Sequence, residues 1–108
     1  MNKNEFRRVL RAYARLHKLT ILSRLDVERL KRLEPVLSAA LRDASHTFYS
    51  CSRTIAFASR GVGTFPSDIE RVEAIRAWRR LHRAEIALGH PMYADYGRMT
   101  VDRLIGAF

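Results

Sequence analysis

Apolar side chains recur at helical spacing along most of the 108-residue chain, and this pattern predicts an all-α protein. A first helix is expected over residues 3–18, because its apolar and cationic side chains fall on two opposite arcs. The apolar arc consists of Phe6, Val9, Leu10, Tyr13, Leu16 and His17. The cationic arc consists of Arg7, Arg8, Arg11, Arg15 and Lys18. This division into two faces is the strongest amphipathic pattern in the sequence.

Two further helices are expected on either side of Pro35. Ser23, followed three residues later by Asp26, approximates a capping box and predicts a helix over residues 23–33. Proline breaks a helix interior but is favoured at a first helical position, so a third helix is expected over residues 35–60. An apolar seam with alternating steps of four and three runs along it, made of Leu37, Leu41, Ala44, Phe48, Cys51, Ile55 and Ala58.

Glycine and proline mark the next breaks in the chain. The segment 61–66 contains Gly61, Gly63 and Pro66, and it predicts a turn. Ser67, with Glu70 three residues later, then begins a fourth helix over residues 68–88, which Gly89 ends. A short last helix is expected over residues 101–107.

Together these elements predict one domain, residues 1–108, folded as a compact bundle of about five helices. The long third helix is expected at the centre, with the first and fourth helices packed on it through their apolar arcs. The seam of the third helix could instead pair with the same seam in a second chain, so a homodimer is an alternative.

Composition places the chain among ordinary globular proteins, with 47% hydrophobic and 29% charged residues. The single cysteine, Cys51, cannot form an internal disulfide bond, and no apolar run approaches the roughly 20 residues that a membrane span needs. Arginines interrupt the N-terminal segment, so it lacks the apolar region of a signal peptide. A cytoplasmic protein with no membrane partner is therefore expected.

Charge narrows the range of functions further. The chain contains 20 Lys and Arg residues but only 11 Asp and Glu residues, which gives a net charge of +9. Residues 1–32 hold ten basic and three acidic residues, which gives +7 of that excess. The cationic arc of the first helix has the composition of a phosphate-contacting stripe on a nucleic-acid-binding protein. An acidic protein surface, or plain solvation of the helix, are the alternatives.

A second basic group falls on one side of the fourth helix and consists of Arg76, Arg79, Arg80 and Arg83. The main apolar side of the same helix is separate from these arginines, and Trp78 on that side is expected to anchor the helix in the core. A second apolar group, beside the arginines, consists of Ile69, Val72, Ile75 and Ile86. The pattern favours a helix sandwiched within the bundle, and the alternative is a protein interface rimmed by arginines.

A third candidate lies opposite the seam of the long helix. Basic and aromatic residues interleave there in one narrow arc of Arg42, His46, Tyr49, Arg53 and Arg60. Such an arc can bind single strands by stacking and charge, although it is more often the solvated side of a helix.

Catalytic and metal-binding patterns are poor. The four histidines show no spacing of a metal site, a lone cysteine excludes a Cys-x-x-Cys pair, and there is no phosphate-binding loop. No enzyme activity, metal or cofactor is therefore expected. The leading hypothesis is an accessory or regulatory protein that binds nucleic acid or a nucleoprotein complex. The alternative is an adaptor or inhibitor that docks its arginine-rimmed apolar surface on an acidic protein partner.

Overall fold

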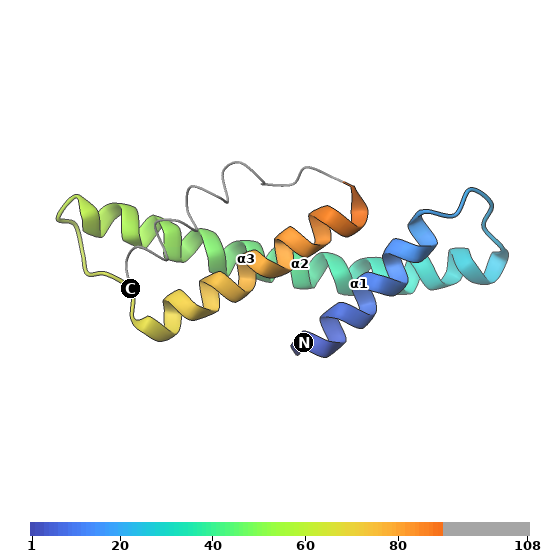
Figure 1. The fold of residues 1–108 in the computed structure, drawn as a ribbon, viewed down its shortest axis with the longest axis horizontal. Coiled ribbons are helices and arrows are strands. Elements are labelled where there is room, and N and C mark those ends of the chain that lie inside the picture. The colour runs from blue at the N-terminus through green and yellow to red at the C-terminus, as the bar shows by residue number, and fades with distance from the viewer. Residues whose placement is uncertain (90–108) are drawn as a thin grey trace.

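The computed structural model describes residues 1–89, which form three helices and no strand. They are α1 (Lys3–His17), α2 (Arg24–Ser59) and α3 (Asp68–Leu88), in chain order (Figure 1). The expected all-α class is confirmed. The expected number of helices is wrong, since the segments 23–33 and 35–60 form one helix. The last expected helix, over residues 101–107, lies outside the described residues.

Pro35 lies inside α2 and does not end it. An internal proline removes one backbone hydrogen bond and costs about 3 kcal/mol relative to alanine. Its side chain is exposed, so the carbonyl that loses its partner can be hydrated. Helix α1 packs against Leu37, two residues after this position, through the cluster that contains Phe6 and Leu10. Packing against α1 therefore keeps α2 continuous where the sequence predicts a break.

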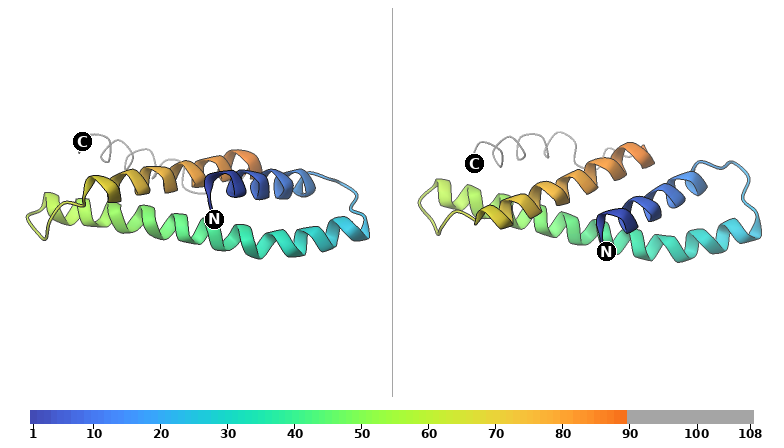
Figure 2. Two further views of the ribbon diagram at one scale, coloured as in Figure 1. Left: turned by 90° about the horizontal axis from the view of Figure 1, so that it is seen from below. Right: turned by 60° about the horizontal axis from the view of Figure 1, so that its bottom comes forward.

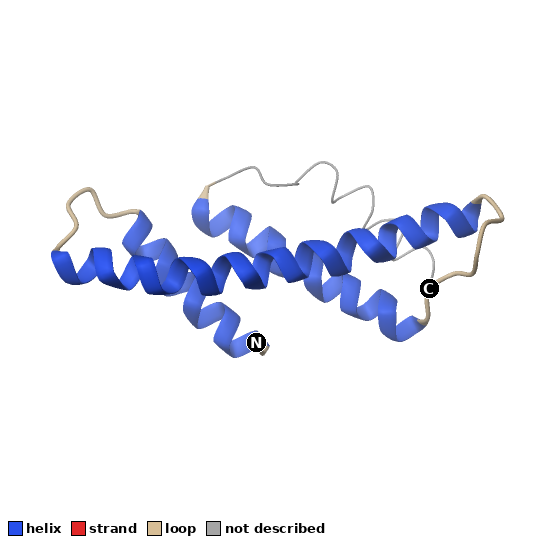
Figure 3. Cartoon of the chain, turned by 180° about the vertical axis from the view of Figure 1, so that it is seen from behind, coloured by secondary structure: helices blue, strands red, loops and turns tan. Residues whose placement is uncertain are grey.

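Helices α1 and α3 lie side by side on the same side of α2, as both views in Figure 2 show. Helix α1 covers the N-terminal half of α2 and α3 covers the C-terminal half, and both run antiparallel to α2 (Figure 3). The molecule measures 56 × 24 × 18 Å, with a radius of gyration of 16.2 Å. A compact chain of this length would have a radius of about 13 Å. The bundle is therefore elongated, and the expected compact shape is wrong.

The core consists of two clusters along the seam of α2. The larger one packs Ala44, Phe48, Cys51 and Ile55 of α2 against Ala74, Ala77 and Leu81 of α3. The smaller one joins all three helices and contains Phe6, Leu10, Leu37, Ala40 and Ala84. The predicted seam is thus confirmed as the inner face of the long helix. Because α1 and α3 of the same chain cover it, it is not free to pair with a second copy, and homodimerisation stays a prediction.

The helix ends follow the local signals in the sequence. Ser23 and Asp26 form a reciprocal capping box, with hydrogen bonds of 3.0 and 3.2 Å. The Ser67 hydroxyl accepts from the backbone N–H of Glu70 at 3.2 Å, and Gly89 ends α3 with a φ of 67°. Asn2 caps α1, a role that the sequence analysis did not assign. Each helix therefore begins at a side chain that accepts a hydrogen bond from its first turn.

Candidate nucleic-acid interface

A basic cavity lies between the first turns of α1 and the second half of α3. It has a volume of about 450 Å³, and its lining consists of Lys3, Phe6, Arg76, Arg79, Arg80 and Arg83. The four arginines share one side of α3 because they are three or four residues apart. Lys3 reaches the same cavity because α1 starts beside the middle of α3. The cavity therefore combines five cations from two helices that are far apart in sequence.

Arg80 connects the two helices. Its guanidinium carbon lies 5.7 Å from the centre of the Phe6 ring, and its Nη2 donates to the backbone carbonyl of Met1 at 3.4 Å. The Arg80 side chain is half-buried, whereas Arg76, Arg79 and Arg83 are exposed. Arg80 thus holds the start of α1 in place, and the three exposed arginines remain accessible to a ligand.

The cavity is electrostatically unbalanced. No acidic side chain lines it, and none of its five cations forms an ion pair within residues 1–89. Cations clustered without counter-charges create a positive potential that attracts anions over a distance of about one Debye length. The surface is therefore suited to a polyanion.

Most of the cationic arc of α1 lies on the exposed side of that helix. Arg8, Arg11, Arg15 and Lys18 are exposed, and they lie opposite the buried stripe of α1. Arg76, Arg79 and Arg83 lie opposite the buried stripe of α3. Both helices rest on one side of α2 (Figure 2), and side chains opposite the buried stripe of a helix project away from the helices packed against it. The two predicted groups thus share one broad face of the molecule.

Arg7 differs from the other members of its arc. It is only half-exposed, and its Nε is buried without a hydrogen-bond partner among the described residues. A buried donor without a partner costs roughly 1–3 kcal/mol. Arg7 therefore offers less of its side chain to a ligand than the exposed Arg11 does.

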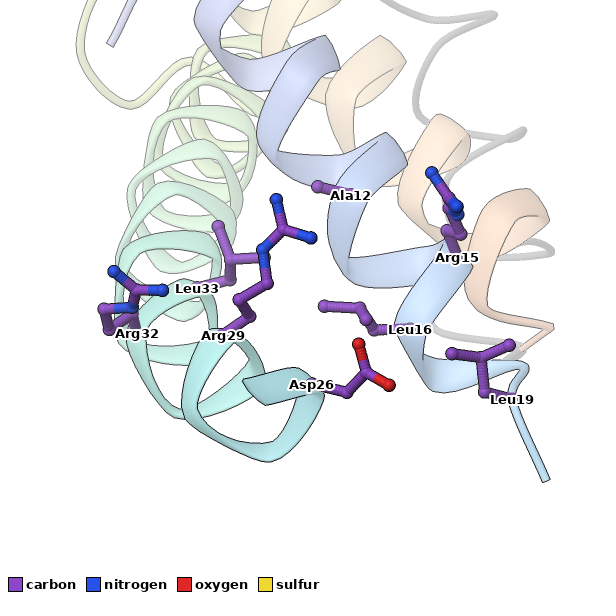
Figure 4. Close-up of a pocket in the computed structure, with 8 residues that line it drawn as sticks. All are labelled: Ala12, Arg15, Leu16, Leu19, Asp26, Arg29, Arg32 and Leu33. Atoms are coloured by element: carbon purple, nitrogen blue, oxygen red, sulfur yellow. The ribbon is translucent and has the colours of Figure 1, made fainter. Parts of the chain in front are cut away.

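Arg15 also lines a second cavity, between the C-terminal half of α1 and the start of α2. This cavity has a volume of about 380 Å³, and Figure 4 shows its lining, which consists of Ala12, Arg15, Leu16, Leu19, Asp26, Arg29, Arg32 and Leu33. The carboxylate of Asp26 lies beside Leu16, and Arg29 extends across toward Ala12. Hydrogen bonds from the Ser23 backbone and hydroxyl lower the pKa of Asp26, and Arg29 and Arg15 lower it further. An ionised carboxylate thus offsets part of the positive charge here.

The second apolar group of α3 is exposed, so the expected sandwich is wrong. Ile69, Val72 and Ile86 expose 73%, 38% and 68% of their surface, and only Ile75 packs against the core. The reason is that the buried side chains of α3 form one narrow stripe, which consists of Ala74, Ala77, Leu81 and Ala84. Ile69, Val72 and Ile86 therefore lie among the arginines on the exposed side of α3.

Trp78 packs at the edge of the larger core cluster, as predicted for an anchor. Its ring stacks on His82, with ring centres 4.9 Å apart and planes 7° apart. It is half-buried, and it does not line the basic cavity. A role as a base-stacking platform in that cavity is therefore not available to it.

Sequence reasoning missed several residues of these sites. Lys3 and Phe6 line the basic cavity, and Arg29 and Arg32 join Arg15 at the second cavity. The basic excess of residues 1–32 pointed to this region. The joining of these side chains depends on where α1 crosses its neighbours, which no local pattern records.

Comparison of the chain with protein-family models, with curated proteins and with solved structures finds no match. Within residues 1–89, no three side chains of the metal-ligating types gather at one point. None of α1, α2 and α3 combines the length and the hydrophobicity of a membrane-crossing helix. The proposal below therefore depends on the geometry and charge of the surface itself.

Proposed function

We propose that this protein binds nucleic acid through the outer face of α1 and α3, as a non-enzymatic accessory or regulatory protein. The observation that carries the proposal is the convergence of Lys3 with the α3 arginines in one cavity without acidic residues. The exposed arginines and lysine of α1 extend that positive surface.

The spacing of the cations suits a phosphate backbone. Arg76 and Arg83 are seven residues apart, or about 10 Å along the helix axis. Helices packed side by side have axes about 8–10 Å apart, so α1 adds a second row of cations at a similar distance. Such a platform can contact several phosphates of a duplex together. Arginine forks donate two parallel hydrogen bonds to a phosphate, and phosphate contacts do not discriminate sequence. Binding that is weakly specific or unspecific follows.

The test is a fluorescence-anisotropy titration of a labelled 20-base-pair duplex at several salt concentrations. Replacing both Arg79 and Arg83 with alanine removes two exposed cations from a helix that tolerates alanine well. Each lost phosphate contact lowers the slope of log affinity against log salt by about 0.9, so the slope should fall by about 1.8.

A control with the same net charge separates contact from overall attraction. Arg24→Ala with Lys31→Ala also removes two cations, both exposed on the first turns of α2 and outside the basic cavity. This control should change the slope by much less than the Arg79 and Arg83 pair. Equal effects of the two double variants would contradict a defined interface. A double charge reversal of Arg11 and Arg15 that leaves duplex binding unchanged would remove α1 from it.

The exposed isoleucines favour a second candidate, an adaptor or inhibitor that docks on an acidic protein. Ile69 and Ile86 are among the most exposed large apolar side chains of the described residues, and both lie beside the arginines of α3. Apolar side chains with an arginine rim are typical of protein interfaces. Under this hypothesis Val72→Ser with Ile86→Ser abolishes capture of an acidic partner, and capture depends little on salt. The same variant should leave duplex affinity unchanged if nucleic acid is the ligand.

A further inference from the structure

A groove along α2 carries the third candidate arc of the sequence. It has a volume of about 600 Å³, and its lining consists of Leu41, Arg42, Ser45, His46, Tyr49, Ser50, Arg53, Thr54, Phe57 and Leu81. It shares no residue with the basic cavity. Four of the five residues of the predicted arc thus line one groove, and Arg60 lies one turn beyond it.

Basic and aromatic side chains are interleaved along this groove. Arg42, His46, Tyr49, Arg53 and Phe57 follow at steps of four, three, four and four residues, which keeps them within one arc of α2. Phe57 exposes 47% of its surface, whereas Tyr49 is half-buried and packs against the larger core cluster, with its ring edge-on to Phe48 at 5.3 Å. The arc from Arg42 to Phe57 spans about 22 Å along the helix axis.

The positive charge of the groove, like that of the basic cavity between α1 and α3, is not balanced by acidic side chains. No acidic side chain lines it, and neither Arg42 nor Arg53 forms an ion pair within residues 1–89. Three hydroxyl residues, Ser45, Ser50 and Thr54, lie along the lining. The Thr54 hydroxyl donates to the Ser50 carbonyl at 2.9 Å, so its oxygen still has a free lone pair.

We propose that this groove binds a single strand of nucleic acid, with a base stacked on Phe57 and the phosphates held by Arg42 and Arg53. Paired bases in a duplex are stacked on each other and cannot offer their faces to Phe57, whereas unpaired bases can. A ligand that carried only phosphates would not use the exposed Phe57 ring. The proposal deepens the nucleic-acid function proposed above and rests on it, while using a different surface.

The test compares two labelled eight-nucleotide probes by anisotropy, oligo-dT and an abasic strand of the same length and charge. Stacking on an aromatic ring contributes about 1–3 kcal/mol per base, so the native protein should bind oligo-dT at least about fivefold more tightly. Phe57→Ala should abolish this preference and leave abasic binding unchanged. Phe57→Trp should restore it, and the fluorescence of the new tryptophan should be quenched by the strand. Arg53→Ala should weaken both probes equally.

The duplex titration separates failure of this proposal from failure of the function as a whole. If the duplex binds and responds to Arg79→Ala with Arg83→Ala, while oligo-dT and the abasic strand bind equally, the groove proposal is overturned alone. If Phe57→Ala weakens duplex and oligo-dT to the same extent, the groove does not select single strands and the proposal is again overturned. If neither duplex nor strand binds, both proposals fail.

Discussion

Phe6 holds α1 on the rest of the molecule, and replacing it with alanine tests this arrangement. The Phe6 ring is 1% exposed and packs in the cluster where all three helices meet. It also lies under the guanidinium of Arg80, 5.7 Å from its centre. Truncation removes nearly the whole buried ring and leaves a cavity, because Leu10 and Leu37 on either side cannot collapse fully into the space.

The expected cost is about 3–5 kcal/mol in the free energy of unfolding, the range for a buried phenylalanine truncated to alanine. About 0.5–1 kcal/mol of this cost comes from the loss of the cation–π contact with Arg80. A domain of this size has a total stability of about 5–15 kcal/mol. The change therefore removes a large fraction of the stability, and its largest local effect should be on α1.

Urea unfolding followed by circular dichroism measures the global change, and hydrogen exchange locates it. Backbone amides of α1 should lose protection most, while the larger cluster around Phe48 stays protected. Phe65→Ala is the matched control, since Phe65 is 55% exposed and its truncation should cost only about 1 kcal/mol. Equal costs for the two variants, or unchanged protection of α1, would refute this account of how α1 is held.

Three further predictions concern α2. Pro35→Ala should raise the free energy of unfolding by about 2 kcal/mol in urea titrations, because alanine suits a helix interior better by about 3 kcal/mol and proline gains part of that back by restricting the unfolded chain; a loss of stability would mean that α2 ends at Pro35. Burial raises the pKa of the Cys51 thiol. The contribution of this shift to the free energy of unfolding is therefore fully present below the unfolded pKa of about 8.5, and it is lost as the pH rises through the higher folded value. The urea midpoint of the native protein should fall above that pH more than that of Cys51→Ala, and iodoacetamide should label the folded protein far more slowly than the denatured one. The lowered pKa of Asp26 has the opposite sign: its contribution to stability is present above the unfolded pKa of about 3.9 and is lost as pH falls through the lower folded value. Ser23→Ala should therefore destabilise the protein by about 1 kcal/mol at neutral pH and by less in acid, and a pH-independent difference would argue against the capping box.

Local sequence signals predicted the helices and most of their ends. Ser23, Ser67 and Gly89 act within one turn of chain, so their effect does not depend on what packs nearby. The heptad-like seam predicted the inner face of α2 for the same reason, because residues three and four apart share a face of any helix. The position of the arginines on the outer faces of α1 and α3 followed from the same periodicity.

Tertiary packing decided the rest. Pro35 disfavours an isolated helix, and α2 continues through it because α1 packs against Leu37, just after the proline. The exposure of Ile69 and Ile86 follows from the narrow contact stripe of α3, since only one side of that helix meets another.

The candidate site shows the same division. Its arginines were visible in the sequence, but Lys3 enters the cavity only because α1 and α3 lie side by side on one side of α2. The sequence by itself determined which faces are apolar, which are cationic and where the helices are capped, because these are properties of neighbouring residues. Which faces meet, and which cations share a surface, was decided by the burial of side chains far apart in the chain, and no local pattern encodes that.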